Sequence, residues 1–323
     1  MSHLKIGKEN TLAVNILNNR AKKRKKIIAY IRKSWILYLF VLPAIVYLII
    51  FNYIPMYGVQ IAFKDYRASL GILGSPWVGL KHIITFFDSY QFVQLLINTL
   101  ALSFYGLIAG FPVPIILALL LHYTKNQRFK KLTQMVTYAP HFISTVVFCG
   151  MIFILLGNEG VYNQIIEILG FDKIKFMSKP EYFRHIYVWT DVFKGMGWSS
   201  IIYIAALSGV DPQIHEAAII DGASKIQRII HVDFPSILPT IIILLILNAG
   251  RIMSVGFEKA FLLQNNLNLE HSEIISTYVY KVGIQSGQFS YSTAIGLFNN
   301  IINFLLLILV NKISKKITNI GVW

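Results

Sequence analysis

Charged residues are scarce in this chain, and acidic residues are the scarcest among them. Of its 323 residues only 14% are charged, with 15 Asp and Glu against 30 Lys and Arg, whereas 55% are hydrophobic. A soluble domain of this length needs more charge to cover its surface. A single cysteine, Cys149, is present, so a disulfide framework is excluded as well. The composition therefore points to a membrane protein.

Motifs of several enzyme classes are also missing. The sequence has no G-x-x-x-x-G-K-[ST] phosphate loop and no G-x-S-x-G nucleophile turn. His215 and Glu216 begin like the zinc-protease motif H-E-x-x-H, but Ile219 stands where the second His is required. We therefore expect no catalytic residue, no metal ligand and no cofactor in this chain.

The sequence is rich in long apolar runs. A helix that crosses a bilayer needs about 20 mostly apolar residues. Six segments meet this requirement, at 35–54, 92–121, 135–156, 186–207, 237–253 and 294–310. They lack the period-two alternation of barrel strands. The predicted fold is an all-α polytopic membrane protein with six transmembrane helices.

The positive charges indicate which helix ends face the cytoplasm. With six spans, both termini lie on the same side as the loops after the second and fourth spans, and these segments hold 19 of the 30 Lys and Arg. Because cytoplasmic loops are rich in Lys and Arg, we expect both termini inside a multi-pass protein of the cell membrane. The basic cluster at 22–26 is expected against anionic lipid headgroups. This distribution explains the net charge of +15 without a nucleic-acid partner.

The predicted organisation has four parts. A basic cytoplasmic tail (1–34) precedes the first span and an extracytoplasmic segment (35–91), a core of five spans (92–312) and a cytoplasmic C-terminal tail (313–323). The core contains a cytoplasmic loop at 209–239, which predicts two short helices. Asp211 before Pro212 starts the first helix, and Asp221–Gly222 ends it. Asp221 is expected to cap a second helix from about Ala223 to 234–235.

Two interpretations of this loop are about equally open on composition. Small residues at positions 217, 218, 222 and 223 let the backbone of another protein approach closely, which suits a docking element. The other interpretation is an ordinary interfacial link between two spans.

A sequence motif in this loop favours its interpretation as a docking element. Glu216-Ala217-Ala218 followed by Asp221-Gly222-Ala223, with Phe234-Pro235 later, resembles the EAA motif of binding-protein-dependent transport permeases, roughly EAA-x-x-DGA. Phe234 replaces the Leu of the later Leu-Pro pair. Two further stretches, Trp77-Val78-Gly79-Leu80 and Asn98-Thr99-Leu100, are similar to maltose-type sugar permeases. VGFEKAFLL at 255–263 is similar to their polysaccharide and oligosaccharide branch.

The resemblance covers about residues 35–323 and implies the fold of a type I importer permease of the ATP-binding-cassette (ABC) class, in a bacterial membrane. It implies four kinds of partner: a second related permease, two ABC ATPase subunits that bind and hydrolyse ATP with Mg²⁺, an extracytoplasmic solute-binding protein, and a saccharide. It also assigns coupling to the ATPase to Glu216, Ala217, Ala218, Asp221, Gly222 and Ala223.

Polar residues inside spans are costly and tend to face a water-filled path. Asn248, Arg251 and Ser254 follow each other at spacings of three, with Glu258 four further on, which predicts a shared helical face. The sixth span adds Asn299 and Asn303 as candidates for the substrate path. If Arg251 lines the path, an acidic sugar becomes the expected cargo.

Aromatic rings of the fourth span, at Trp189, Tyr187 and Trp198, are further candidates, because a ring face can stack on a sugar. Alternatives are open for both sets, since Asn also ties membrane helices together and Trp also belongs to the interfacial belt. Asp191 and Lys194, three residues apart, predict an ion pair near the outer end of this span.

Two other functions stay open. One is a permease of the same class for another solute. The other is an ion-coupled secondary transporter, for which internal repeats and buried carboxylates along an ion path are expected. No such repeat is visible in the sequence.

Overall fold

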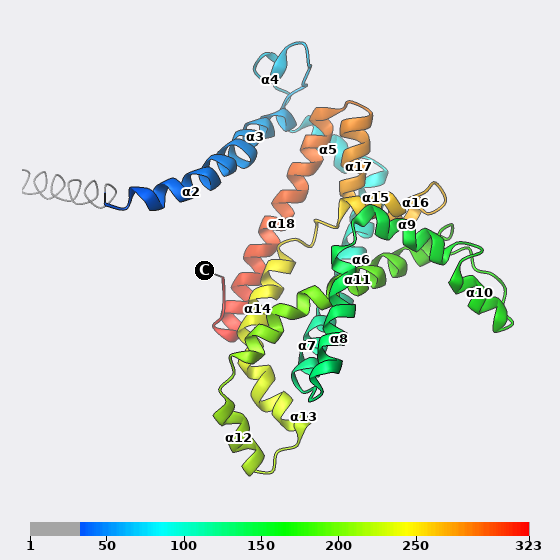
Figure 1. Ribbon diagram of the computed structural model, residues 1–323. Helices are drawn as coiled ribbons and strands as arrows, with labels where there is room; N and C mark the ends of the chain where they lie inside the picture. Colours follow the sequence, from blue (N-terminus) through cyan, green and yellow to red (C-terminus); the bar gives the residue numbers. More distant parts are fainter. Residues whose placement is uncertain (1–32, 323) are drawn as a thin grey trace, which may run out of the picture. The chain divides into compact units, whose positions relative to one another are not determined.

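The computed structural model describes residues 33–322, which fall into two units, one ending at Gln60 and one beginning at Ile61 (Figure 1). All but the last two residues of the predicted basic tail, 1–34, lie outside the described residues. No β-strand forms within residues 33–322, where an isolated bridge pairs Lys64 with Trp77.

The first unit is one apolar helix with a widened turn. It comprises α2 (Trp35–Leu48), the π-helical turn η1 (Ile49–Tyr53), α3 (Ile54–Met56) and the start of the 3₁₀ segment η2 (Tyr57–Phe63). The π turn precedes Pro55, whose ring would otherwise meet the carbonyl four residues before it. The candidate span is Trp35–Phe63, so the predicted end at residue 54 is too early.

The second unit consists of helices joined by turns and irregular segments. Its elements are α4 (Gly71–Gly74), α5 (Lys81–Phe87), α6 (Gln91–Gly110), α7 (Pro112–His122), α8 (Gln127–Tyr138), η3 (Ala139–Phe142), α9 (Thr145–Leu156), α10 (Val161–Ile168), α11 (Pro180–Ser208), α12 (Pro212–Ile220), α13 (Lys225–Arg228), η4 (Ile229–Asp233), α14 (Phe234–Ala249), α15 (Phe257–Leu263), α16 (Leu269–Ser272), α17 (Ile275–Tyr280), η5 (Lys281–Gln285) and α18 (Phe289–Thr318).

Five helices among the described residues are long and apolar enough to cross a membrane: Trp35–Phe63, Gln91–His122, Thr145–Ile168, Lys225–Ala249 and Phe289–Thr318. The fourth predicted span, 186–207, lies in α11, which has 29 residues and also carries charged side chains. This helix packs against α6, α7, α8 and α14, and its charged side chains lie at exposed or half-buried positions. Figure 1 shows α11 running beside α6 and α7.

The predicted third span, 135–156, is not one helix. Helix α8 ends at Tyr138, a 3₁₀ turn contains Pro140, and Ile143 is extended before Ser144 caps α9. Proline lacks the backbone N–H that an α-helix requires, so the chain is interrupted inside an apolar run. The long apolar helix here begins at Thr145 instead.

The helix after the loop at 209–239 is longer than predicted. It does not stop at Phe234–Pro235, because α13, η4 and α14 form one helical stretch from Lys225 to Ala249. Ser224 and Gln227 form its capping box, so the expected cap at Asp221 is wrong. The stretch ends at Ala249 rather than 253, whereas α18 runs beyond both predicted ends of the sixth span.

Three buried clusters hold the second unit together, and α11 takes part in two of them. Phe183 and Val188 of α11 pack with Phe148 of α9, and Tyr203 and Leu207 pack with Ile237 of α14. The third cluster joins α5, α6, α14, α17 and α18. Close contact between α11 and α8 depends on Gly197, where a Cβ would lie 2.1 Å from the Thr137 carbonyl oxygen.

Candidate functional site

A cavity of about 740 Å³ lies between α6, α7, α11 and the end of α14. Its wall carries three residues predicted for the substrate path, Asn248, Arg251 and Ser254. The rings of Tyr187 and Trp198, from α11, also line it. The residues that line the cavity thus carry a guanidinium, an amide, a hydroxyl and aromatic rings. A mainly apolar wall with a few polar groups is typical of ligand sites.

The sequence predicts that polar residues at 248–258 share one face of a single helix. This prediction is wrong, because α14 ends at Ala249. A turn follows, in which the Arg251 N–H donates to the Asn248 carbonyl (3.0 Å) and the Ser254 N–H to the Arg251 carbonyl (2.8 Å). This turn brings the three side chains to one cavity. Glu258 falls in the first turn of α15.

Asn303 of α18 supports the turn from behind. Its Oδ1 accepts the Met253 N–H (2.8 Å) and its Nδ2 donates to Ser254 Oγ (2.9 Å), while the residue is only 8% exposed. It is not among the residues that line the cavity. Asn303 therefore ties α18 to the turn after α14, which is close to the alternative role considered for Asn within spans.

Asn299 and Trp189 also lie off the cavity wall. Asn299 is half-buried, and its Oδ1 has no hydrogen-bond partner. Trp189 is exposed, and its Nε1–H donates to the Tyr105 hydroxyl (2.8 Å), which in turn contacts Nδ1 of His185 (2.9 Å).

The charges of α11 are paired differently from the prediction. Asp191 lines the cavity and binds Lys259 of α15 (3.2 Å), whereas Lys194 donates to Thr145 Oγ1 (3.3 Å). Lys259 is 5% exposed and also donates to the Tyr187 carbonyl (2.7 Å). The predicted pair of Asp191 with Lys194 is therefore wrong. Lys259 was missed, although a lysine inside the apolar run at 255–263 signals a buried partner.

The loop at 209–239 folds as predicted at its first helix. Asp211 caps α12 by accepting the Gln213 N–H (2.9 Å), and Gly222 beyond the helix has φ of +77°, a left-handed conformation that suits glycine. The bend at Gly222 is confirmed. Glu216, Ala217 and Asp221 are exposed like Gly222, while Ala218 and Ala223 are half-buried. Ile219 and Ile220 of the loop are 55% and 85% exposed.

A buried carboxylate connects this loop to the bundle. Asp233, at the end of η4, is fully buried, and its Oδ2 accepts the Tyr123 hydroxyl (2.6 Å). Its Oδ1 lies 3.0 Å from Nε2 of His215 in α12. Burial, together with this hydrogen bond, raises the pKa of Tyr123 to about 12, which keeps the phenol a donor. Sequence reasoning missed Asp233, although an Asp within an apolar run is again a signal.

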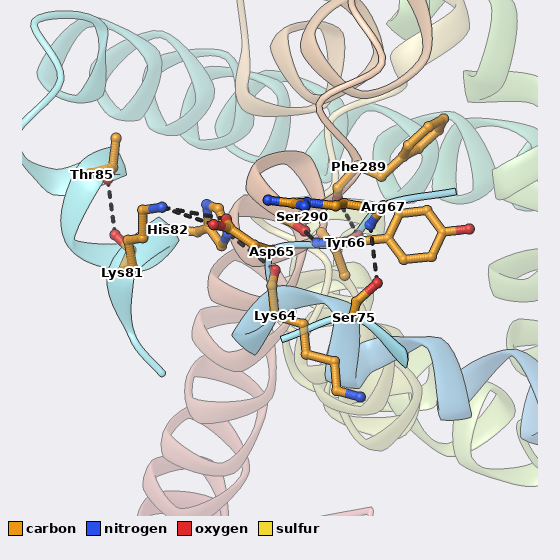
Figure 2. A network of polar contacts seen from close by, with 11 residues as sticks. Lys64, Asp65, Tyr66, Arg67, Ser75, Lys81, His82, Thr85, Phe289 and Ser290 are labelled. Carbon is orange, nitrogen blue, oxygen red and sulfur yellow. Dashed lines mark hydrogen bonds and ion pairs between the residues drawn. The ribbon is translucent and has the colours of Figure 1, made fainter. Parts of the chain in front are cut away.

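A second polar network fixes the segment that follows η2 (Figure 2). Lys81 and His82 of α5 lie 3.1 and 3.2 Å from the carboxylate of Asp65. The backbone N–H of Tyr66 donates to Ser290 Oγ at the start of α18 (2.8 Å). The hydrogen bond from Lys81 lowers the pKa of Asp65 below its ordinary value of 3.8. This network anchors the segment to two helices.

Comparisons with known proteins find relatives that cover nearly the whole chain. The chain is 42% identical over 321 residues to the polygalacturonan/rhamnogalacturonan transport system permease protein YteP of Bacillus subtilis strain 168, covering 99% of this chain and 100% of that protein. It is 37% identical to a chain in the crystal structure of a bacterial ABC transporter involved in the import of the acidic polysaccharide alginate, with a TM-score of 0.84 over 91% of this chain and 99% of that chain. A structure of the bacterial alginate ABC transporter in complex with an alginate pentasaccharide-bound periplasmic protein matches equally well, with 38% identity, a TM-score of 0.84 and coverage of 90% and 98%.

These likenesses confirm the predicted fold, that of a helical ABC importer permease embedded in a membrane by several spans. Residues 110–319 match the family described as the binding-protein-dependent transport system inner membrane component. That region includes α11, the loop with α12 and the turn after α14. The chain therefore belongs to the family of binding-protein-dependent transport system inner membrane components.

Proposed function

We propose that this chain is a permease subunit of an ATP-driven importer whose cargo is an oligosaccharide or polysaccharide bearing carboxylates. The observation that carries the cargo is Arg251 on the cavity wall, beside Asn248 and Ser254. A guanidinium binds a carboxylate through paired, charge-assisted hydrogen bonds. Amide and hydroxyl groups suit sugar hydroxyls, which both donate and accept. Relatives that transport polygalacturonan or the acidic polysaccharide alginate support this cargo.

The importer requires partners beyond this chain. A solute-binding protein delivers the saccharide from outside, a second related permease completes the path, and two ABC ATPase subunits bind ATP with Mg²⁺ and hydrolyse it. The family description and the transporter structure with a bound periplasmic protein support this composition.

Coupling to the ATPase is assigned to α12 and the bend after it. Glu216 and Ala217 are exposed there, next to the exposed apolar side chains of Ile219 and Ile220. Such side chains, on a short helix outside the candidate spans, suit a cleft on another subunit. Closure of the ATPase dimer would then push the helix, and η4 would carry the movement into α14.

The assignment of α12 to ATPase coupling also sets the orientation of the chain in the membrane. The loop faces the cytoplasm, and both termini lie on that side. The excess of Lys and Arg in these segments supports it. The Asp65 network, between the first two spans, would then face outward.

The cargo is tested by uptake into cells that carry the complete importer. Labelled trigalacturonate is compared with an uncharged trisaccharide, in the wild type and in Arg251→Gln. A charged hydrogen-bonded contact contributes about 1.5–3 kcal/mol, so we expect uptake of the acidic sugar to fall roughly tenfold or more. Arg128→Gln is the matched control, because Arg128 is exposed on α8 and off the cavity wall.

Three results would contradict parts of the proposal. Preference of the wild type for the uncharged sugar would exclude the acidic cargo, and undiminished acidic uptake in Arg251→Gln would exclude the Arg251 contact from which that cargo is inferred. Uptake that continues after ATP depletion and stops when ion gradients are collapsed would exclude an ATP-driven importer and favour a secondary transporter.

A further inference from the structure

Three potential metal ligands meet where the cytoplasmic loop joins the bundle. His122 ends α7, His215 lies in α12 and Asp233 ends η4. One ligand atom from each lies within 4.8 Å of the other two. Sequence spacing gave no sign of this cluster, because its members come from elements far apart in the chain.

The hydrogen bonds around Asp233 leave one of its oxygens uncommitted. Tyr123 donates to Oδ2 at 2.6 Å. The other oxygen, Oδ1, and Nε2 of His215 are both shielded from solvent, and neither makes a hydrogen bond, although they are 3.0 Å apart. A proton on Nε2 or a cation bound to both atoms would satisfy this buried pair. The third potential ligand nearby, His122, favours the cation.

Geometry fits a small cation. Zinc binds His nitrogen and carboxylate oxygen at about 2.0–2.2 Å, which places neighbouring tetrahedral ligands roughly 3.3 Å apart. The 3.0 Å separation of His215 and Asp233 is close to that edge. The imidazole rings of His122 and His215 are 6.0 Å apart between centroids, so small ring rotations would bring both nitrogens to one ion.

We propose that His122, His215 and Asp233 form a binding site for Zn²⁺. The hydroxyl of Tyr123 acts as the outer partner that orients the ligating carboxylate, as such partners do in zinc proteins. Two imidazole nitrogens favour Zn²⁺ over Mg²⁺ or Ca²⁺, which prefer oxygen ligands. This proposal departs from the sequence-based expectation that the chain has no metal ligand, and it is independent of the transported cargo.

The site would link the docking helix α12 to the bundle at two points, the end of α7 and the start of α14. A bound ion would therefore resist movement of α12 relative to the spans. The expected functional consequence is slower ATP-driven uptake at Zn²⁺ concentrations that fill the site.

The test measures Zn²⁺ binding to the complete importer, purified with a streptavidin-affinity tag, stripped with chelator and titrated in excess Mg²⁺. We expect the wild type to bind one more Zn²⁺ per copy of this chain than His122→Gln or His215→Gln. His231→Gln is the matched control, because His231 is exposed on η4, where its Nδ1 faces the Gln227 carbonyl. Only complexes that elute intact from gel filtration are compared.

Tyr123→Phe separates an outer partner from a ligand. It should weaken Zn²⁺ binding roughly 10- to 100-fold without changing the stoichiometry. Co²⁺ in the wild-type site should give the visible absorption of a tetrahedral site, and His122→Gln should abolish it. Equal Zn²⁺ binding by the wild type, His122→Gln and His215→Gln, or loss of the ion in His231→Gln, would overturn the proposal.

Discussion

Lys259 and Asp191 form an ion pair of 3.2 Å in which the two partners differ sharply in exposure, with side chains 6% and 65% exposed. The cation is buried between α15 and α11, while the carboxylate reaches into the cavity. Removing the carboxylate and removing the ammonium should therefore affect stability by different amounts. Asp191→Asn leaves a buried ammonium without its counter-charge, whereas Lys259→Met leaves a carboxylate that water can solvate.

We expect Asp191→Asn to lower the free energy of unfolding by about 1–3 kcal/mol, and Lys259→Met to lower it by less. Thermal unfolding of the purified permease in detergent measures both. Equal destabilisation by the two variants would argue against the asymmetry.

Asn303 is expected to matter through the turn that it holds. Asn303→Leu removes the acceptor for the Met253 N–H and the donor to Ser254, at a cost of about 1–3 kcal/mol. The turn that presents Arg251 should loosen, so uptake should fall as well. Asn300→Leu is the control, because Asn300 is exposed on the same helix. Unchanged uptake in Asn303→Leu would show that the turn is held without it.

The effect of a substitution at Gly222 should depend on the backbone conformation that the new residue tolerates and not on its volume. A Cβ there meets nothing within 4 Å, but the residue has φ of +77°. Gly222→Ala should cost about 1–2 kcal/mol in this left-handed conformation and weaken transport-coupled ATP hydrolysis. Gly222→Asn should be milder, because Asn tolerates the conformation. A variant order with Asn worse than Ala would point to a steric contact with the ATPase.

Gly197 should behave in the opposite way. A Cβ would lie 2.1 Å from the Thr137 carbonyl oxygen, which is backbone and cannot move aside, so α8 and α11 must separate. We expect Gly197→Ala to cost at least the roughly 1–3 kcal/mol typical of overpacking. Gly195→Ala, two residues earlier and with nothing within 4 Å, should leave the unfolding temperature nearly unchanged.

The Asp65 network predicts a pH dependence. The bond from Lys81 lowers the pKa of Asp65 below 3.8 in the folded protein, so the folded state favours the charged form. Its stabilisation is complete above the unfolded-state pKa and is lost as the pH falls through the lower folded-state value. The unfolding temperatures of the wild type and Asp65→Asn should differ by a small, constant amount between about pH 5 and 7 and converge below about pH 4. A difference that grows on acidification would contradict this pairing.

Apolar length predicted the long helices well where nothing interrupts them. The second predicted span, 92–121, matches the apolar stretch Gln91–His122 closely. It failed at 135–156, because an apolar run conceals Pro140 and the cap at Ser144, and hydropathy counts neither. It also ended the sixth span early, since polar residues continue α18 at both ends without breaking it.

The site was only partly accessible from the sequence. Arg251 was identified because a charge near an apolar run is costly, and the same signal was present at Asp233 and Lys259. What no spacing could supply is the partner: Lys259 lies 68 positions from Asp191, and Asp233 lies 110 from Tyr123. Such pairings depend on how helices pack, which is decided by the whole bundle.

The π turn η4 also sets the rotation of α13 and α12 about the axis of α14. A π turn holds one more residue than an α turn, and each residue of an α-helix advances the chain by about 100° around the axis. Deleting one residue from Ile229–Asp233 would therefore rotate α13, and the α12 segment attached to it, by about that angle relative to α14. The side chains of Ile219 and Ile220 would then point in a different direction about the axis of α14. The extra residue thus determines the direction in which α12 presents the side chains that are proposed to dock on the ATPase.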